Sequence, residues 1–537
     1  MSVMLDERYQ WRSRTLGALT IHDRGDGAAV DSIAQSLMAI AKPTINDAIT
    51  ALHNADGHFA AIVEGPDYLL ACVDHCRTIP VFFADRAKDD APLVSNCARL
   101  VKATARLEQV DEVSALEASM AGFVTGRHTL YEGLEQLQAG DLLWHDKHSG
   151  ETAVRQYNAY RPETFNDASE ADLIEQLGVV TDRAMDRVIA QAGGAPIWVP
   201  LSAGLDSRLI LCKLVERGYD NLFAFSYGPA GNDEAKAARA IAKRLGVPWR
   251  FWPNRNRDMR RLYASSDRAD YWAFGDGLCA LPNFQDFPTL HEQCRRGEVP
   301  GGAVVVNGQT GDFISGGHIP KPLWDNNTPT LDDLFDAVVA KHYSLWTSLK
   351  TPDNLATLRA RMLETLGLGG DERPGRDAII ALYERWEYQE RQAKYIVNGQ
   401  RNYDFLGLDW ALPLWDRQLV DFWRDLPPEH KFRKRLYRRY LDAWDFKDLF
   451  RDYKPVVWQW PGATKAVLPL FRLVRLVFGP SARDRLLKRL LYFGMYRYQY
   501  APFGYHDFLR HAENLRNPIS LLSRHWLAEL GVAAGVR

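Results

Sequence analysis

A short segment near the middle of the chain combines the residue types that can hold a phosphate group. Residues 197–208, IWVPLSAGLDSR, begin as an apolar strand-like run and pass through Ser202, Gly204, Asp206 and Ser207 into a helical pattern. Small side chains in such a turn let backbone N–H groups approach an anion, and the helix N-terminus adds partial positive charge. The spacing differs from the Walker pattern GxxxxGK[ST]. The segment therefore predicts a phosphate-binding turn that opens a helix.

A second segment of the same kind carries another aspartate. Residues 303–318, AVVVNGQTGDFISGGH, run from an apolar stretch into a small-residue turn that contains Gly308 and Asp312. Two carboxylates at the ends of neighbouring strands can share a Mg²⁺ ion that keeps its other coordination sites for phosphate oxygens and water.

These two turns need a parallel sheet to bring them together. Strand-like runs at 197–201, 221–228 and 247–252 alternate with helical patterns and short connections, which predicts a doubly wound parallel α/β sheet with ligands at the carboxyl ends of its strands. Pro200 counts against this interpretation, because proline removes a hydrogen-bond donor from a central strand.

The regions on either side have different patterns. Residues 1–160 hold β-like runs at 56–64 and 68–74, expected as a hairpin, and at 80–84, 93–96, 122–124, 129–134 and 138–144. A polar linker and a helix to residue 192 lead into a second domain at 170–450. Residues 451–537 are expected as a helical extension, in which the apolar, arginine-containing run 466–478 either packs over the core, which we favour, or lies on a membrane surface.

Composition excludes several classes of function. The 537 residues carry a net charge of −2, which gives no electrostatic argument for binding nucleic acid or membranes. No CxxC pair or histidine cluster at metal-ligand spacing occurs, so we expect neither structural zinc nor a disulfide framework, and Cys72 and Cys76 are interpreted as small buried hydrophobes. The polar N-terminus lacks an apolar signal region, and no apolar run reaches membrane-spanning length, so we expect a cytoplasmic protein.

The two turns resemble a known family. The first reads S-x-G-x-D-S and is similar to the pyrophosphate loop of the ATP pyrophosphatases; the second is similar to the asparagine synthetase phrase SGEGSDExFGGY, with Gly308, Asp312, Gly316 and Gly317 in register. The resemblance implies an ATP-pyrophosphatase domain with Mg²⁺ on Asp206 and Asp312. It also implies that ATP or pyrophosphate contacts a set of loop residues: Leu201, Ser202, Gly204, Asp206, Ser207, Phe225, Ser226 and Gly308.

Later segments extend the resemblance. Residues 401–416 are similar to GxExRxPFLD, with Asp409 in the place of the glutamate and Ala411 in that of the arginine, and residues 434–438 are similar to KxxLR. This implies catalytic roles for Asp409 and Lys434, since a cation near the α-phosphate stabilises the charge of the transition state. A solvated basic helix face is the alternative interpretation of residues 431–439.

The N-terminal region resembles the glutaminase domain of asparagine synthetases, which implies an Ntn-hydrolase-like α+β fold of two sheets. The family's glutaminase uses a cysteine at residue 2 as nucleophile, but this chain has Ser2 and no cysteine before Cys72. We therefore expect a glutaminase-like domain without that activity. Phe313 also replaces a family glutamate, and with Trp410, Trp415 and Tyr403 we expect a more aromatic pocket and a substrate other than free aspartate.

The resemblance thus implies an ATP-dependent ligase of the branch that includes β-lactam synthetase. It would adenylate a carboxylate, release pyrophosphate and pass the acyl group to a nitrogen donor: free ammonia, ammonia from a partner protein, or an amino group of a second or the same substrate. Three alternatives stay open: a sulfur-transferring pyrophosphatase, a non-catalytic nucleotide-binding regulator, and a scaffold protein.

Overall fold

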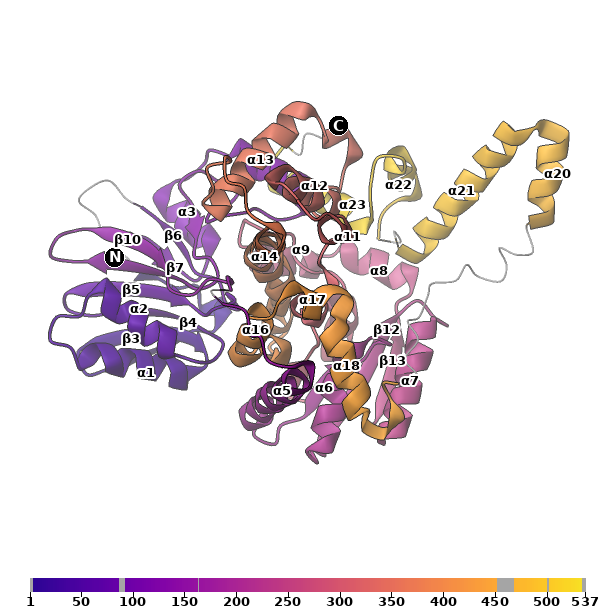
Figure 1. Cartoon of the computed structure of the whole chain (residues 1–537). Helices are drawn as coiled ribbons and strands as arrows, with labels where there is room; N and C mark the ends of the chain where they lie inside the picture. Colours follow the sequence, from indigo (N-terminus) through magenta and orange to yellow (C-terminus); the bar gives the residue numbers. More distant parts are fainter. Residues whose placement is uncertain (1–2, 86–91, 163, 452–467, 500–501, 534–537) are drawn as a thin grey trace.

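The computed structural model describes residues 3–85, 92–162, 164–451, 468–499 and 502–533, so Ser2 lies outside the described residues. The N-terminal region contains two sheets (Figure 1). The larger is antiparallel, with the spatial order β10 (Thr152–Gln156), β9 (Asp141–Asp146), β5 (Tyr68–Val73), β4 (Phe59–Glu64), β3 (Leu19–Gly25) and β2 (Arg12–Leu16). The smaller has the order β1 (Val3–Met4), β7 (Leu93–Ser95), β6 (Phe82–Ala84) and β8 (Glu135–Gln136).

Strand periodicity explains how these sheets pack. In β5 the side chains of Tyr68, Leu70 and Cys72 join a hydrophobic cluster with helices α1 (Gly27–Met38) and α2 (Ile45–Asn54). The alternate side chains of β5 face a second cluster, which they share with Phe83 and Val94 of the smaller sheet. Helices α3 (Ala98–Ala105) and α4 (Glu112–Ala121) lie between β7 and β8 in the chain, and α3 packs against β6 and β7. Because successive side chains of a strand point to opposite faces, one sheet has a core on each face.

Two expected strands of this region are absent from the structure. Residues 122–124 and 129–134 form only isolated bridges, Phe123 to Ala280 and Tyr131 to Val110. Their backbones bond instead to a distant loop, since the amides of Val124 and Leu130 donate to carbonyls at residues 279 and 278 (2.8 and 2.9 Å). The predicted hairpin is present as the antiparallel pair β4–β5.

The second region is built on a five-stranded parallel sheet, as predicted. Its order is β13 (Trp249–Pro253), β12 (Leu222–Gly228), β11 (Ile197–Pro200), β14 (Val304–Val306) and β15 (Asp409–Ala411). Helices α5 (Glu170–Ala192), α6 (Leu205–Glu216) and α7 (Asp233–Leu245) pack in a cluster on one face, while Trp198 and Phe225 pack in another cluster on the opposite face. Pro200 is the last residue of β11, where its missing donor costs little.

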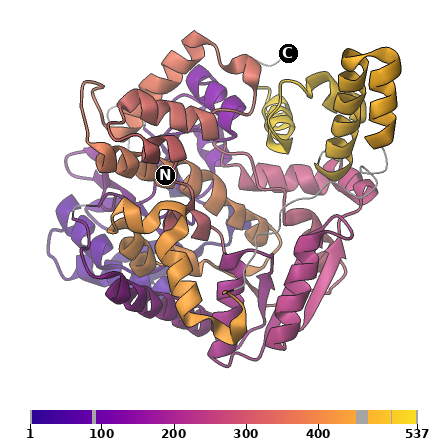
Figure 2. The same cartoon turned by 45° about the vertical axis from the view of Figure 1, so that its right-hand side comes forward.

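Helices surround the sheet and connect it to the N-terminal region (Figures 1 and 2). They are α8 (Asn256–Tyr263), α9 (Ser266–Gly275), α10 (Phe287–Arg295), α11 (Lys321–Asp325), α12 (Leu331–Lys341), α13 (Pro352–Leu366), α14 (Arg376–Trp386), α15 (Arg401–Phe405), α16 (Arg417–Arg424), α17 (Pro428–Lys431) and α18 (Arg435–Trp444). Two π-helical segments, η2 (Phe313–Gly317) and η4 (Glu387–Ile396), lie among them.

The C-terminal region divides into two parts. Helices α22 (Tyr505–His511) and α23 (Pro518–Glu529) join the large helical core through Phe508, Leu521 and Trp526. In contrast, α20 (Leu468–Phe478) and α21 (Pro480–Gln499) form a hairpin that projects from the body of the molecule (Figure 1). This corrects the expectation that the apolar run packs over the core; residues 466–467 of that run lie outside the described residues. None of the helices in the described ranges has the length and apolarity to span a membrane.

Candidate nucleotide-binding site

The first predicted loop joins β11 to α6. The Leu201 amide donates to the Phe225 carbonyl (2.8 Å), which extends the β11–β12 pairing by one residue. The Ser202 hydroxyl then accepts from the Gly204 amide (3.0 Å), and the Ser202 amide donates to the Ser207 hydroxyl (3.1 Å). Gly204 precedes α6, and no side chain among the described residues caps this helix. The first-turn amides of α6 are therefore available to an anion.

The second predicted loop follows β14, the parallel neighbour of β11. Two glycines let its backbone approach the first loop. A β-carbon on Gly308 would lie 2.9 Å from the backbone nitrogen of Ser207, and one on Gly311 would lie 2.5 Å from Cγ of Asp206. Both distances are shorter than real β-carbon contacts, so only glycine fits at either position without a shift. This close approach places Asp312 beside the first loop.

Lys434 brings the two loops into one cluster. The residue has a left-handed backbone (φ 61°) and immediately precedes α18. Its Nζ contacts the Asp312 carboxylate and lies 4.0 Å from Oδ2 of Asp206. One turn further along α18, the Tyr437 hydroxyl donates to Oδ1 of Asp206 (2.9 Å). The structure therefore brings together Asp206, Asp312 and Lys434, three charged residues that the sequence analysis placed in separate segments.

Burial changes the protonation behaviour of this cluster. It raises the pKa of Asp206, an effect opposed by the charge of Lys434 and the hydrogen bond from Tyr437. It also lowers the pKa of Lys434, an effect that Asp206 opposes. The side chain of Asp312, in contrast, is 62% exposed. One sheltered and one open carboxylate that share a cation are a suitable donor set for a hard divalent ion such as Mg²⁺.

These residues line a cavity of about 490 Å³. It lies at the carboxyl edge of the parallel sheet, where open α/β folds bind their ligands. Of the predicted site residues, the cavity is lined by Ser202, Gly204, Asp206, Ser207, Gly308, Asp312 and Lys434. Nine further lining residues were not among the predicted site residues: Pro200, Leu205, Tyr227, Asn283, Gln285, Asp286, Asn307, Gln309 and Arg438.

Asp286 is the principal residue that sequence reasoning missed. Its partly buried carboxylate accepts hydrogen bonds from the hydroxyls of Tyr227 and Tyr403, the latter at 2.7 Å. Burial raises the pKa of Asp286, and both hydrogen bonds oppose that rise. For its partner Tyr227, the sequence did offer a signal of a site position. Tyr227 directly follows the predicted Phe225 and Ser226 near the end of β12.

The chain also matches a family model. The model described as asparagine synthase matches residues 182–460, slightly more than half of the chain, and so includes both loops and Lys434. The chain belongs to the asparagine synthase family. A comparison with curated proteins finds no match.

Solved structures add two distant similarities. One is a glutamine phosphoribosylpyrophosphate amidotransferase from B. subtilis in complex with ADP and GMP, with 11% identity over 55% of this chain and 56% of that one and a TM-score of 0.17. The other is described as the allosteric regulatory enzyme of purine biosynthesis, with 13% identity over 55% of each chain and a TM-score of 0.18. The chain spans little more than half the length of either protein.

Three predicted ATP-binding residues of this asparagine synthase family member lie behind the cavity. Leu201, Phe225 and Ser226 are buried and do not line it. The Ser226 hydroxyl donates to the Leu201 carbonyl (2.6 Å) and accepts from the Trp249 indole N–H (3.0 Å), while Phe225 packs against Trp252 with ring centroids 5.5 Å apart. These side chains position the phosphate loop.

The structure does not bring Asp409 together with Lys434. Asp409 is exposed, and it begins β15, where it pairs with Val304, the first residue of β14. It lines a separate cavity of about 580 Å³, between the two regions of the chain. This corrects the prediction of a catalytic Asp409, because the first residues of parallel strands lie at the sheet edge opposite to the one that carries both loops.

The expected aromatic pocket is corrected as well. Trp415 is fully buried, and Trp410 lines the separate cavity with Asp409. Tyr403 is buried and contacts the nucleotide-site cavity only indirectly, through its hydrogen bond to Asp286. The cavity wall therefore presents mainly polar side chains, and aromatic content in nearby sequence was misleading because these rings pack into the core.

The contact between the loops makes Gly311 sensitive to substitution. We expect Gly311→Ala to weaken MgATP binding by about 10-fold or more, because the new methyl group would overlap the Asp206 carboxylate and push the loops apart. Isothermal titration calorimetry with MgATP measures this effect. Gly301→Ala is the matched control, since a β-carbon there meets no atom within 4 Å. Equal affinities for the two variants would contradict the prediction.

Proposed function

We propose that this asparagine synthase family member is an ATP-dependent ligase that adenylates a substrate carboxylate and converts it into an amide, without glutaminase activity of its own. Family membership supports an ATP-dependent, amide-forming ligase in general. The observation that carries the finer proposal is the convergence of Asp206, Asp312 and Lys434 on one cavity at the carboxyl edge of the sheet.

The first proposed step is attack on the α-phosphorus of ATP. A carboxylate oxygen of the substrate bonds to this phosphorus as the bond to the bridging oxygen breaks, and pyrophosphate leaves with the electron pair. We expect the first-turn amides of α6 to hold the pyrophosphate and the Lys434 ammonium to offset the negative charge that develops at phosphorus. Preorganised donors of this kind lower the barrier by a few kcal/mol each, or about 10²- to 10³-fold in rate.

The residues present fit a Mg²⁺ ion. Asp206 and Asp312 approach the same cation, the Lys434 ammonium, and Gly308 and Gly311 keep the space beside them clear of side chains. Bound by Asp206 and Asp312, Mg²⁺ would neutralise charge on the phosphates during transfer.

The second proposed step uses an amine nitrogen. Its lone pair attacks the acyl carbon, AMP leaves, and the nitrogen loses a proton, which yields an amide. Ser2 stands where the family's glutaminase has its cysteine, so we propose that the nitrogen comes from free ammonia, from a partner protein, or from an amino group of a substrate.

The cavity wall supports a polar acid as the substrate. Side-chain amides of Asn283, Gln285 and Gln309 line the cavity together with the Asp286 carboxylate. Such groups pair with hydroxyl and amino groups, which favours a sugar acid or a peptide-like acid over an apolar one.

Pyrophosphate–ATP isotope exchange tests the adenylation step. MgATP is incubated with labelled pyrophosphate and a panel of acids that includes aspartate, uronic acids and short peptides. Exchange that depends on one polar acid and is lost in Lys434→Ala supports the proposal. MgATP binding without exchange for any acid of the panel would favour the regulatory interpretation instead.

The nitrogen donor can be tested separately. With the acid found by exchange, we expect amide formation with ammonium salts or a free amine and none with glutamine alone, since residue 2 offers a hydroxyl rather than a thiol. Mass spectrometry of the product and an assay of released glutamate measure both parts. Glutamate release that disappears in Ser2→Ala would contradict this prediction.

A further inference from the structure

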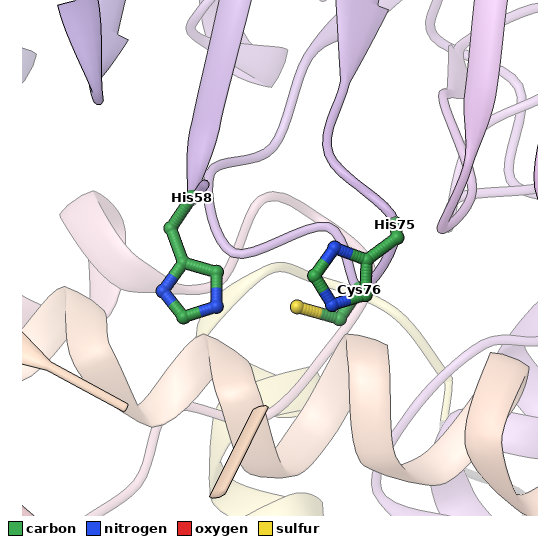
Figure 3. A group of neighbouring side chains, drawn as sticks. All are labelled: His58, His75 and Cys76. Atoms are coloured by element: carbon green, nitrogen blue, oxygen red, sulfur yellow. The ribbon is translucent and has the colours of Figure 1, made fainter. Parts of the chain in front are cut away.

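Three potential metal ligands converge at the end of two paired strands of the N-terminal region. His58 immediately precedes β4, and His75 and Cys76 follow β5, so antiparallel pairing brings them together. One donor atom from each side chain lies within 4.8 Å of the others. In Figure 3 a ring nitrogen of each histidine points toward the sulfur of Cys76.

A backbone oxygen completes the donor set. Nε2 of His58 and Nε2 of His75 lie 3.2 and 3.0 Å from the same carbonyl oxygen, that of Trp415. Two imidazole nitrogens, one sulfur and one oxygen around a common point match the preferences of a borderline-soft ion that accepts tetrahedral coordination. We propose that His58, His75 and Cys76 form a Zn²⁺ site, with the Trp415 carbonyl as the fourth ligand.

The surroundings allow an ion to enter and to be retained. His75 and Cys76 are buried, while His58 is partly exposed, and both histidines line the 580 Å³ cavity between the two regions of the chain. Binding breaks the S–H bond, forms the S–Zn bond, and releases the proton to solvent through the cavity.

The position suggests what the ion does. His58, His75 and Cys76 belong to the N-terminal region, whereas Trp415 ends the short helix η6 (Pro413–Trp415), two residues beyond β15. An ion bound there joins the two regions and stabilises their interface. This structural role is independent of the proposed ligase activity.

Cobalt spectroscopy tests the site directly. The full chain, prepared without a metal-affinity tag and treated with chelator, is titrated with Co²⁺. We expect a sulfur-to-cobalt charge-transfer band that saturates at stoichiometric Co²⁺ and is abolished by Zn²⁺. Oxygen donors at Asp206 and Asp312 give no such band, so an ion bound there is distinguished.

The variants separate the cluster from other thiols. Cys76→Ser is expected to lose the band, while Cys72→Ser, a buried cysteine of β5 outside the cluster, keeps it. His58→Ala, which changes a partly exposed side chain, is expected to weaken Co²⁺ binding by at least about 10-fold and provides a test that does not depend on folding of the cysteine variants. A missing band in the unmodified chain, or a band that persists in Cys76→Ser, would overturn the proposal.

A second inference concerns the projecting hairpin of α20 and α21. Apolar side chains on α20 are open to solvent, with Leu476 84% and Phe478 73% exposed, together with Leu470, Leu473 and Val477. Residues 468–499 hold seven lysines and arginines and one acidic residue, Asp484, although the whole chain has a net charge of −2. We infer that this hairpin binds an anionic membrane surface.

Charge and geometry favour a membrane over other occupants. On α20, Arg472 and Arg475 lie on one side of the helix, and Leu470, Leu473 and Val477, spaced three and four residues apart, lie on another. A helix of this kind settles at the boundary between acyl chains and headgroups, and its cations attract acidic lipids.

Vesicle sedimentation of the full chain tests the inference. We expect it to pellet with vesicles that contain phosphatidylglycerol, to pellet less with pure phosphatidylcholine, and to detach as salt rises. Leu473→Glu/Val477→Glu, on the apolar side of α20, should lower partitioning by at least about 10-fold, whereas Met38→Glu/Val179→Glu, exposed apolar sites elsewhere, should not. Failure to bind acidic vesicles would overturn the inference. Self-association of the chain that the first double variant abolishes would also overturn it, because that result indicates that a second copy of the chain covers the hairpin.

Discussion

Replacing Asp206 with asparagine is expected to lower acid-dependent ATP–pyrophosphate exchange by about 100- to 1,000-fold, or roughly 3–4 kcal/mol of transition-state stabilisation. Asparagine preserves the shape of the side chain and its acceptor for the Tyr437 hydroxyl, which donates over 2.9 Å. It removes the charge that pairs with Lys434 and that would hold Mg²⁺. The loss should therefore appear mainly in kcat.

Tyr437→Phe is the control for this prediction. It removes only the hydrogen bond to the Asp206 carboxylate, so we expect a decrease of about 10-fold or less. Exchange rates at saturating MgATP measure both variants. If Asp206→Asn were as active as the unmodified chain, the proposed roles of both loops would be wrong.

The second large effect concerns stability. We expect Lys431→Ala to destabilise the fold by about 3–5 kcal/mol, because it leaves Glu384 buried without its partner. The Lys431 Nζ lies 2.6 Å from Oε2 of Glu384, and both side chains are almost wholly buried. Burial raises the pKa of Glu384, and Lys431 opposes that rise. Urea denaturation followed by tryptophan fluorescence measures the loss.

We expect Lys431→Ala to disturb the candidate nucleotide-binding cavity as well. Lys431 lies against the segment that follows Asp312, since a β-carbon on Gly316 would lie 2.4 Å from the Lys431 carbonyl oxygen. Lys431→Met/Glu384→Leu, which removes both charges, is expected to cost less than Lys431→Ala. Lys321→Ala, which removes an exposed ion pair with Asp325, should change stability by about 0.5 kcal/mol or less. A cost for Lys431→Ala no larger than that of Lys321→Ala would contradict the prediction.

The two loops could be predicted because their signals are local. A strand, a turn of small residues and a helix follow one another within a dozen residues at Ile197–Arg208, and hydrogen bonds inside the turn hold it in place. The hairpin β4–β5 and the parallel sheet were predictable for the same reason, since each depends on alternation and short connections.

Asp409 and the tryptophans could not be placed from sequence. Neighbours in the chain enter different environments: Asp409 is exposed at one edge of the sheet, while Trp415 is buried six residues later. Residues 122–134 have strand-like composition, but the amides of Val124 and Leu130 donate to a loop more than 140 residues away. Such choices depend on which surface the rest of the fold presents.

The sequence by itself determined the local structures: the two phosphate loops with Asp206 and Asp312, and the lysine that immediately precedes α18. Only the tertiary structure decided which side chains share a site. It placed Asp286, contributed by a segment between β13 and β14, in the cavity wall, brought His58 to Cys76 across a strand pair, and left α20 outside the core. The physical reason is that turns and helix starts depend on bonds between residues near in sequence, whereas cavities and ligand clusters depend on the packing of distant segments.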